Sequence, residues 1–190
     1  MKVEIEIKLR LPDKLGKIRR RLRKTGFRIM EHRSLESNTL FDNAKHTLRK
    51  HGKLVRVRAT SGRRVLTFKG PSQASKYKKR PEVEIDMPKG ASIELILEHM
   101  GYHPVFRYEK FRTGYAESSA AGKALLDETP IGNFLEIEGS PRWIDRTARR
   151  LGFSPRDYIT RSYGYLYLAY CRERRIPAKD MLFKNRLLKK

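Results

Sequence analysis

Residues 2–10 read Lys-Val-Glu-Ile-Glu-Ile-Lys-Leu-Arg, and this alternation is the clearest structural signal in the chain. Apolar side chains fall at the odd positions and charged ones at the even positions, which is the period of a β-strand with two different faces. The charged face carries glutamate, lysine and arginine together. We therefore predict an amino-terminal β-strand with one apolar face and one face of mixed charge.

The extended pattern continues along the chain. We predict a strand region over 27–41, a hairpin over 54–59 and 65–69 about Gly62, and strands over 80–87, 102–117, 123–128 and 134–139. Helical periodicity covers 12–26, 91–100, 141–151 and 161–174, with a helical turn over 48–52 and a polar loop over 70–79. Without a repeat or linker, we predict one domain over 1–174 and a loosely attached basic tail over 175–190.

The polar faces of the predicted strands collect both signs of charge. Beyond the first strand they carry Arg56, Arg58, Lys69, Arg80, Glu82, Glu84, Lys110, Arg112, Asp127, Glu136 and Glu138. In an ordinary antiparallel sheet such a face would meet water. The amphipathic helices, however, need an apolar sheet face to cover. If they cover the outside of a closed sheet, the charged face must line a lumen.

A lumen of mixed charge suits a polyanion that carries a divalent metal ion. Lysine and arginine form charge-assisted hydrogen bonds with phosphate oxygens. Paired carboxylates bind Mg²⁺ or Mn²⁺, which prefer oxygen ligands and keep phosphate oxygens in their coordination shell. A ligand of this kind needs both types of side chain in one cavity.

Short motifs connect the chain to a known family. They are Glu4-Ile5-Glu6-Ile7-Lys8, Leu54-Val55-Arg56-Val57-Arg58, Leu66-Thr67-Phe68-Lys69-Gly70-Pro71, Lys79-Arg80-Pro81-Glu82-Val83-Glu84, Tyr108-Glu109-Lys110-Phe111-Arg112, Leu126-Asp127-Glu128 with Gly132-Asn133-Phe134-Leu135-Glu136-Ile137-Glu138-Gly139, and Tyr158-Ile159-Thr160-Arg161-Ser162-Tyr163. In this order, over roughly residues 1–168, they resemble the motifs of the CYTH superfamily of triphosphate tunnel metalloenzymes. That superfamily includes class IV adenylyl cyclases and thiamine triphosphatases.

The resemblance implies an α+β fold, a closed antiparallel β-barrel of about eight strands with helices packed on the outside. It implies metal ligands at Glu4, Glu6, Asp127, Glu136 and Glu138 for Mg²⁺ or Mn²⁺. It implies triphosphate contacts at Lys8, Arg56, Arg58, Lys69, Arg80, Lys110 and Arg112, with catalytic roles for Lys8, Lys69 and Arg161. Two alternatives are open for Arg80, Glu82 and Glu84, which either bind the ligand or pair with one another.

Arg161 departs from the family pattern. Many hydrolytic relatives carry lysine before Ser-Tyr at this point. Arginine keeps the charge and can contact phosphate, but its pKa is too high for a general base. Water would then be activated by the metal ions and a carboxylate, or a different nucleophile would be used. Alternatively, Arg161 simply begins a surface helix.

The resemblance indicates a triphosphate more firmly than the group attached to it. We expect hydrolysis of tripolyphosphate, thiamine triphosphate or another triphosphate. A class IV adenylyl cyclase, which converts ATP to cyclic AMP, is the alternative. A non-catalytic module that binds polyphosphate or RNA is a further alternative. The carboxylates argue against such a module, because each would repel phosphate without a metal ion.

Composition adds to these expectations. The 190 residues contain 44 Lys+Arg against 21 Asp+Glu, a formal net charge of +23 that favours an anionic partner. Nucleic acid is possible but not favoured. Cys171 is the single cysteine, so an internal disulfide is excluded. No apolar signal or membrane-spanning segment is found, so we expect a cytoplasmic protein without a membrane partner, as a monomer or homodimer.

Overall fold

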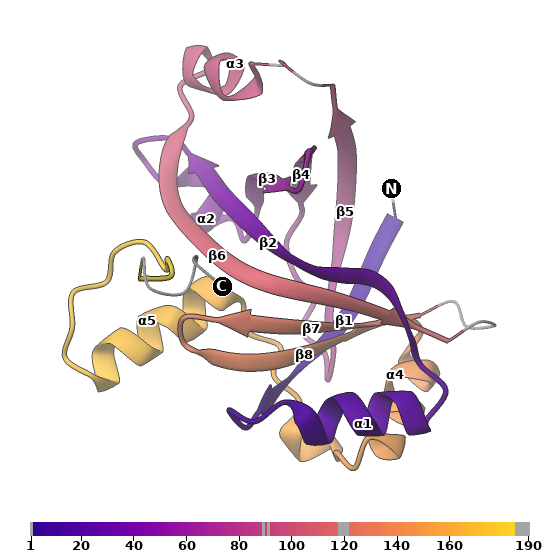
Figure 1. Ribbon diagram of the computed structural model, residues 1–190. Helices are drawn as coiled ribbons and strands as arrows, with labels where there is room; N and C mark the ends of the chain where they lie inside the picture. The colour runs from indigo at the N-terminus through magenta and orange to yellow at the C-terminus, as the bar shows by residue number, and fades with distance from the viewer. Residues whose placement is uncertain (1, 89, 91, 118–121, 185–190) are drawn as a thin grey trace.

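A computed structural model describes residues 2–88, 90, 92–117 and 122–184. Eight strands form its framework: β1 Lys2–Leu11, β2 Arg28–Asp42, β3 Leu54–Thr60, β4 Arg63–Lys69, β5 Lys78–Met87, β6 His103–Ala116, β7 Lys123–Thr129 and β8 Gly132–Glu138. They pair in the order β1-β5-β4-β3-β2-β6-β7-β8, and β8 closes on β1 (Figure 1). Every pairing between neighbouring strands is antiparallel. The predicted closed antiparallel barrel is confirmed.

Closure of the sheet fixes where the charged faces point. On β1, Glu6 lies opposite Lys78 of β5 and opposite Glu138 of β8. Because side chains alternate between the two faces, each of these three residues points into the barrel. Ile7 and Leu9 point outward and are fully buried under helices. The alternation that predicts the strand therefore also separates the core from the lumen.

Two helices cover the barrel beside β1, β7 and β8. They are α1, Gly16–Lys24, and α4, Pro141–Arg150, which lie next to each other in Figure 1. Leu22 and Ile144 are fully buried in one core cluster with the outward side chains of these strands. The Ser140 side chain caps α4 by accepting a hydrogen bond from the backbone N–H of Trp143. This packing makes α4 a firmly anchored element.

The remaining helices occupy other parts of the barrel. Helix α3, Ile93–His99, packs Leu97 against Phe41 and Val57, on the outside of β2 and β3. A short helix, α2, spans Thr47–Lys50, and a 3-10 turn, η1, spans Pro155–Asp157. In the described part of the chain, the helices are too short or too polar to cross a bilayer.

Helix α5, Tyr163–Glu173, closes one end of the barrel instead of lying on its outside. Tyr163 and Tyr167 belong to a buried cluster with the inward-facing Tyr108 and Phe134. The Tyr163 hydroxyl donates a hydrogen bond of 2.7 Å to Asp127 inside the barrel. The four tyrosines along α5 do not form a simple apolar stripe, because part of the helix packs on the open end of the barrel rather than on its wall.

The segment after α5 also differs from expectation. Residues 185–190 of the predicted tail lie outside the described residues, but the preceding part is not loosely attached. Met181 is 1% exposed and its backbone pairs with β6 through hydrogen bonds to Arg107 and Glu109 of 2.9 and 3.0 Å. Asp180 also forms an ion pair with Arg107. Although the segment is basic in composition, it contains one deeply buried methionine that anchors it.

Element boundaries differ modestly from the predicted ones. Helix α1 begins at Gly16 rather than residue 12, and α3 begins at Ile93, two residues after the predicted start. Strand β5 begins at Lys78, so the end of the predicted polar loop already belongs to the sheet. The short turn η1 was not predicted.

Replacing Met181 tests whether this segment contributes to folding. Met181→Ala should lower the free energy of unfolding by about 2–5 kcal/mol, because it leaves a cavity against Tyr108 and Tyr167. Met100→Ala, at a residue that is 66% exposed, should change it by less than about 0.5 kcal/mol. Urea unfolding followed by circular dichroism measures both. Equal small effects would show that the segment is not part of the cooperative fold.

Candidate active site

The barrel encloses a cavity of about 660 Å³ lined by charged side chains. Among the described residues, ten lysines and arginines and six glutamates contribute to its wall. They come from β1, β3, β4, β5, β6, β7 and β8, so strands far apart in sequence meet around one space. The predicted shared lumen of mixed charge is thus present.

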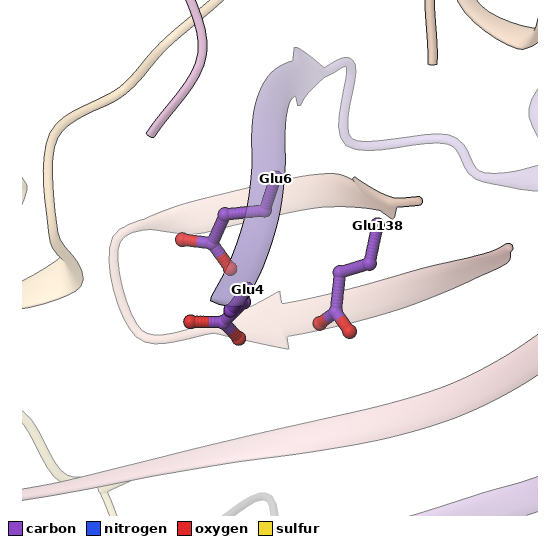
Figure 2. A group of neighbouring side chains, drawn as sticks. All are labelled: Glu4, Glu6 and Glu138. Carbon is purple, nitrogen blue, oxygen red and sulfur yellow. The ribbon is translucent and has the colours of Figure 1, made fainter. Parts of the chain in front are cut away.

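Three carboxylates gather on one side of the cavity. Glu4 and Glu6 come from β1 and Glu138 from β8, and Figure 2 shows their side chains as neighbours. One oxygen from each lies within 4.8 Å of the others. Carboxylate oxygens at such spacing can share one hard divalent cation. These three residues could therefore hold a metal ion.

Lysines compensate the charge of this cluster. The Oε1 atom of Glu6 lies 2.7 Å from the Lys78 ammonium and 2.9 Å from that of Lys8. Burial alone would raise the pKa of Glu6, but these two lysines hold it well below its usual range. Glu4 behaves differently: burial and the neighbouring Glu6 raise its pKa, although Lys69 opposes the shift. A second positive charge near Glu4 would favour its ionised form.

A second group of ion pairs lies beside this cluster. Glu136 accepts from Lys8 at 2.9 Å and also pairs with Arg112. Asp127 is fully buried and accepts from Lys110 at 2.9 Å and from Arg112 and Tyr163. Burial alone would raise the pKa of Glu136, but Lys8, Lys110 and Arg112 hold it well below its usual range. Asp127 is not among the residues that line the cavity, and it does not belong to the group of three neighbouring glutamates.

All seven predicted triphosphate contacts line the cavity. They are Lys8, Arg56, Arg58, Lys69, Arg80, Lys110 and Arg112. Arg80 differs from the others, because its guanidinium donates to the backbone carbonyls of Gly52, Lys69 and Gly70. Its neighbours on the strand pair with other cations: Glu82 with Lys69, and Glu84 with Arg56 and Arg58. Arg80 therefore braces the wall, while the two glutamates hold basic side chains in place.

Arg161 is not brought to the cavity. Its residue is exposed, and its guanidinium lies 4.7 Å from the centre of the Tyr165 ring on α5. The next residues, Ser162 and Tyr163, do line the cavity. The motif thus lies on a segment that reaches the cavity, but the Arg161 guanidinium packs on the Tyr165 ring in the first turn of α5.

Several residues inside the barrel were missed by sequence reasoning. Lys78 shares the inward face with Arg80, so extending the strand period by two residues would have found it. Tyr108 lines the cavity and receives a hydrogen bond from Arg56 at 3.2 Å. Glu36 of β2 does not line the cavity but pairs with Arg112 and Lys110, which do.

Comparison with known proteins bears on this site. The model of the CYTH domain matches residues 2–163. The chain belongs to the CYTH family. The predicted resemblance is confirmed.

Individual relatives agree with this membership. A Methanocaldococcus jannaschii protein named "Putative adenylate cyclase" is 27% identical over 139 residues, which cover 73% of this CYTH chain and 77% of that protein. A structure described as a "putative adenylate cyclase" from Vibrio parahaemolyticus has a TM-score of 0.75 at 22% identity, covering 87% of this chain and 97% of that one. A Hippeastrum protein, described as a "putative adenylyl cyclase" with a dominant triphosphatase activity, has a TM-score of 0.62 at 18% identity, covering 88% and 96%. These structural likenesses concern the fold.

The charge of Glu36 should stabilise the fold in a pH-dependent way. Burial alone would raise its pKa, but Arg112 and Lys110 lower it from 4.5 to about 2. The ionised carboxylate therefore stabilises the protein above about pH 4.5, and this contribution is lost as the pH falls through about 2.

We expect Glu36→Gln to lower the free energy of unfolding by roughly 1–3 kcal/mol at pH 7 and by less than about half of that at pH 3. Urea unfolding at the two pH values measures the difference. Glu31→Gln, at an exposed position on the same strand, is the control and should show a small change at both. A Glu36→Gln effect of the same size at pH 3 would contradict the assignment.

Proposed function

We propose that this CYTH protein is a metal-dependent enzyme that binds a triphosphate inside its barrel and hydrolyses it. One observation carries the proposal: a cavity whose wall combines ten basic side chains with a cluster of three carboxylates. Basic side chains alone would suit any polyanion. The carboxylate cluster adds a place for a divalent cation, which phosphate oxygens need in order to approach these carboxylates.

The clustered glutamates fit the metal that the family implies. Glu4, Glu6 and Glu138 offer only oxygen donors, which Mg²⁺ and Mn²⁺ prefer over softer ligands. A bound divalent ion would neutralise charge on phosphate oxygens and act as a Lewis acid toward the phosphoryl group. We assign Glu136 and Asp127 a different role from the predicted one. Their contacts with Lys8, Lys110 and Arg112 suggest that they orient basic side chains.

The basic residues would bind the triphosphate and stabilise charge that develops on it. Lys8 and Lys110 are each about 2–3% exposed, so water screens their charges weakly. We propose that Lys8 and Lys69 contact the reacting phosphates, since each lies beside a member of the carboxylate cluster. We assign Arg161 no role in the proposed site, because its guanidinium lies over the Tyr165 ring and the residue is not among those that line the cavity.

Two reactions fit this site, and relatives carry the names of both. In hydrolysis, water attacks the terminal phosphorus, the phosphoanhydride bond breaks, and the diphosphate portion leaves. The attacked phosphoryl group becomes inorganic phosphate, and the proton that water loses passes to the diphosphate or to solvent. In cyclisation, the ribose 3′-oxygen of ATP attacks the α-phosphate and pyrophosphate leaves. We favour hydrolysis, because a protein described as an adenylyl cyclase on this fold is also described as having dominant triphosphatase activity. Cyclase activity is the second candidate.

A substrate screen distinguishes these reactions. The purified protein with Mg²⁺ or Mn²⁺ should release inorganic phosphate from tripolyphosphate, thiamine triphosphate or ATP. Phosphate release and chromatography of the nucleotide products measure the outcome. Cyclic AMP and pyrophosphate as the main products from ATP would reverse the order of the two candidates. Binding of tripolyphosphate in excess chelator, without turnover of any substrate, would favour a non-catalytic module.

Removing one carboxylate of the cluster tests the metal assignment. Glu138→Gln should raise the Mg²⁺ concentration for half-maximal activity by on the order of 10-fold or more, because one charged oxygen ligand is lost. Glu128→Gln is the matched control, since Glu128 pairs with Arg19 and Arg33 away from the cavity. An unchanged metal requirement in Glu138→Gln would exclude Glu138 as a ligand.

A further inference from the structure

Two unrelated segments cover the same edge of β1. Strand β5 pairs with β1 from Lys2 to Glu6, and Lys78 is its last partner. Two residues further along, Lys8 exchanges two backbone hydrogen bonds of 2.9 Å with Ile159. The barrel wall therefore has a junction between Glu6 and Lys8. The pairing with β5 reaches its first residue there, and Ile159 takes over as the partner of β1.

One carboxylate on the outside of the barrel holds both segments at this junction. Tyr77, next to Lys78, donates a hydrogen bond of 2.9 Å from its hydroxyl to Oδ2 of Asp145. Tyr158, next to Ile159, donates one of 2.9 Å to Oδ1 of the same carboxylate. Lys76 adds an ion pair of 2.8 Å. Both oxygens of Asp145 are thus engaged, one by each segment.

Asp145 lies on a helix that is packed against the barrel, whereas the segment before Tyr77 is exposed. Helix α4 buries Ile144 before Asp145 and Thr147 after it, which fixes the helix against the barrel. Residues 71–76 are all exposed. Gln73 is tied to Lys79 by one backbone hydrogen bond of 2.9 Å, and Tyr77 packs partly buried against the core cluster that includes α4. The contact of Tyr77 with α4 is therefore a main constraint on this exposed segment.

Two ammonium groups lie on the inner side of the junction, that of Lys78 on β5 and that of Lys8 on β1. Lys78 and Lys8 both contact Oε1 of Glu6, at 2.7 and 2.9 Å. Lys78 directly follows the tyrosine that reaches Asp145, and Lys8 pairs with the residue after the other tyrosine. A shift of either segment would move one ammonium relative to the carboxylate cluster, and small displacements of charged groups are costly in such a site.

We propose that Asp145 is a positioning residue for the triphosphate site, acting through Tyr77 and Tyr158, and that Lys78 is a triphosphate contact. The proposal rests on the proposed function, since it assigns the junction a role in binding the same substrate. Loss of the Asp145 carboxylate releases both segments, so Lys78 and Lys8 sample more positions. Binding of the triphosphate then weakens because ordering these side chains costs conformational entropy.

A coupled set of variants tests the proposal. Tyr77→Phe removes one hydroxyl but keeps the ring, and Asp145→Ala removes both acceptors. We expect Tyr77→Phe to raise the KM for tripolyphosphate with Mg²⁺ by about 3-fold and Asp145→Ala by about 10-fold, with a smaller change in kcat. Calorimetric Kd values for tripolyphosphate with Mg²⁺ should follow the KM values. In a Lys78→Met background, Tyr77→Phe should have no further effect on KM, because its target is gone.

Glu117→Gln provides a matched control. Glu117 also ties α4 to a neighbouring segment, through a 2.5 Å ion pair with Arg150, but it lies away from the junction. This variant should leave KM, kcat and the Kd of tripolyphosphate unchanged. Thermal unfolding of every variant shows whether a change in binding comes from a general loss of stability.

Three results would overturn the inference. One is an unchanged Kd in Asp145→Ala, and another is a Tyr77→Phe effect that persists undiminished in the Lys78→Met background. The third is an equal weakening by Glu117→Gln. In each case, normal Mg²⁺-dependent turnover by the wild-type protein would leave the proposed function intact. A wild-type protein that neither binds nor cleaves tripolyphosphate with Mg²⁺ would overturn the proposed function together with the inference.

Discussion

Charge compensation inside a closed sheet is the constraint on which this structure depends. A barrel whose inner face carries many ionised groups is stable only if those groups pair, because an unpaired buried charge costs several kcal/mol. Asp127 shows how the requirement is met: it is fully buried and accepts from two basic side chains and a tyrosine. Acidic residues that a pure anion binder would avoid are needed here to hold the basic ones in position.

These ion pairs divide the acidic residues of the site into two layers. Glu136 and Asp127 pair with Lys8, Lys110 and Arg112. Glu4, Glu6 and Glu138 pair with lysines as well, but they also bring one oxygen each within 4.8 Å of the others. The first layer sets the direction of the basic side chains. In the proposed function, a metal ion would bind to the second layer, and the lysines there would turn toward the phosphate oxygens.

Sequence reasoning predicts the parts of this protein that follow a period. Alternation along β1 predicts the strand and places Glu4, Glu6 and Lys8 on one face, because the pleat puts residues two apart on the same side. The inward direction of that face is predicted from the amphipathic helices, which need the apolar face, and from the family resemblance. Sequence reasoning fails where side-chain contacts decide. The Arg161 guanidinium packs on the Tyr165 ring instead of lining the cavity. Met181 and Asp145 depend on contacts with segments far away in sequence, for which no local pattern exists. Lys78 does follow the strand period, and it was missed because the predicted strand begins two residues too late.

Closure of the sheet limits how this protein can meet other macromolecules. Each of the eight strands has neighbours on both sides in the described barrel, so a partner chain can extend the sheet only where one strand runs past its neighbour. Strand β5 is such a case: its register with β1 ends at Glu82, and residues 83–87 pair with β4 alone. This stretch also carries Val83 and Ile85, which are 42% and 58% exposed. Elsewhere, self-association would have to proceed through side chains on the outer wall or on the helices, where substitutions can tune it without disturbing the interior.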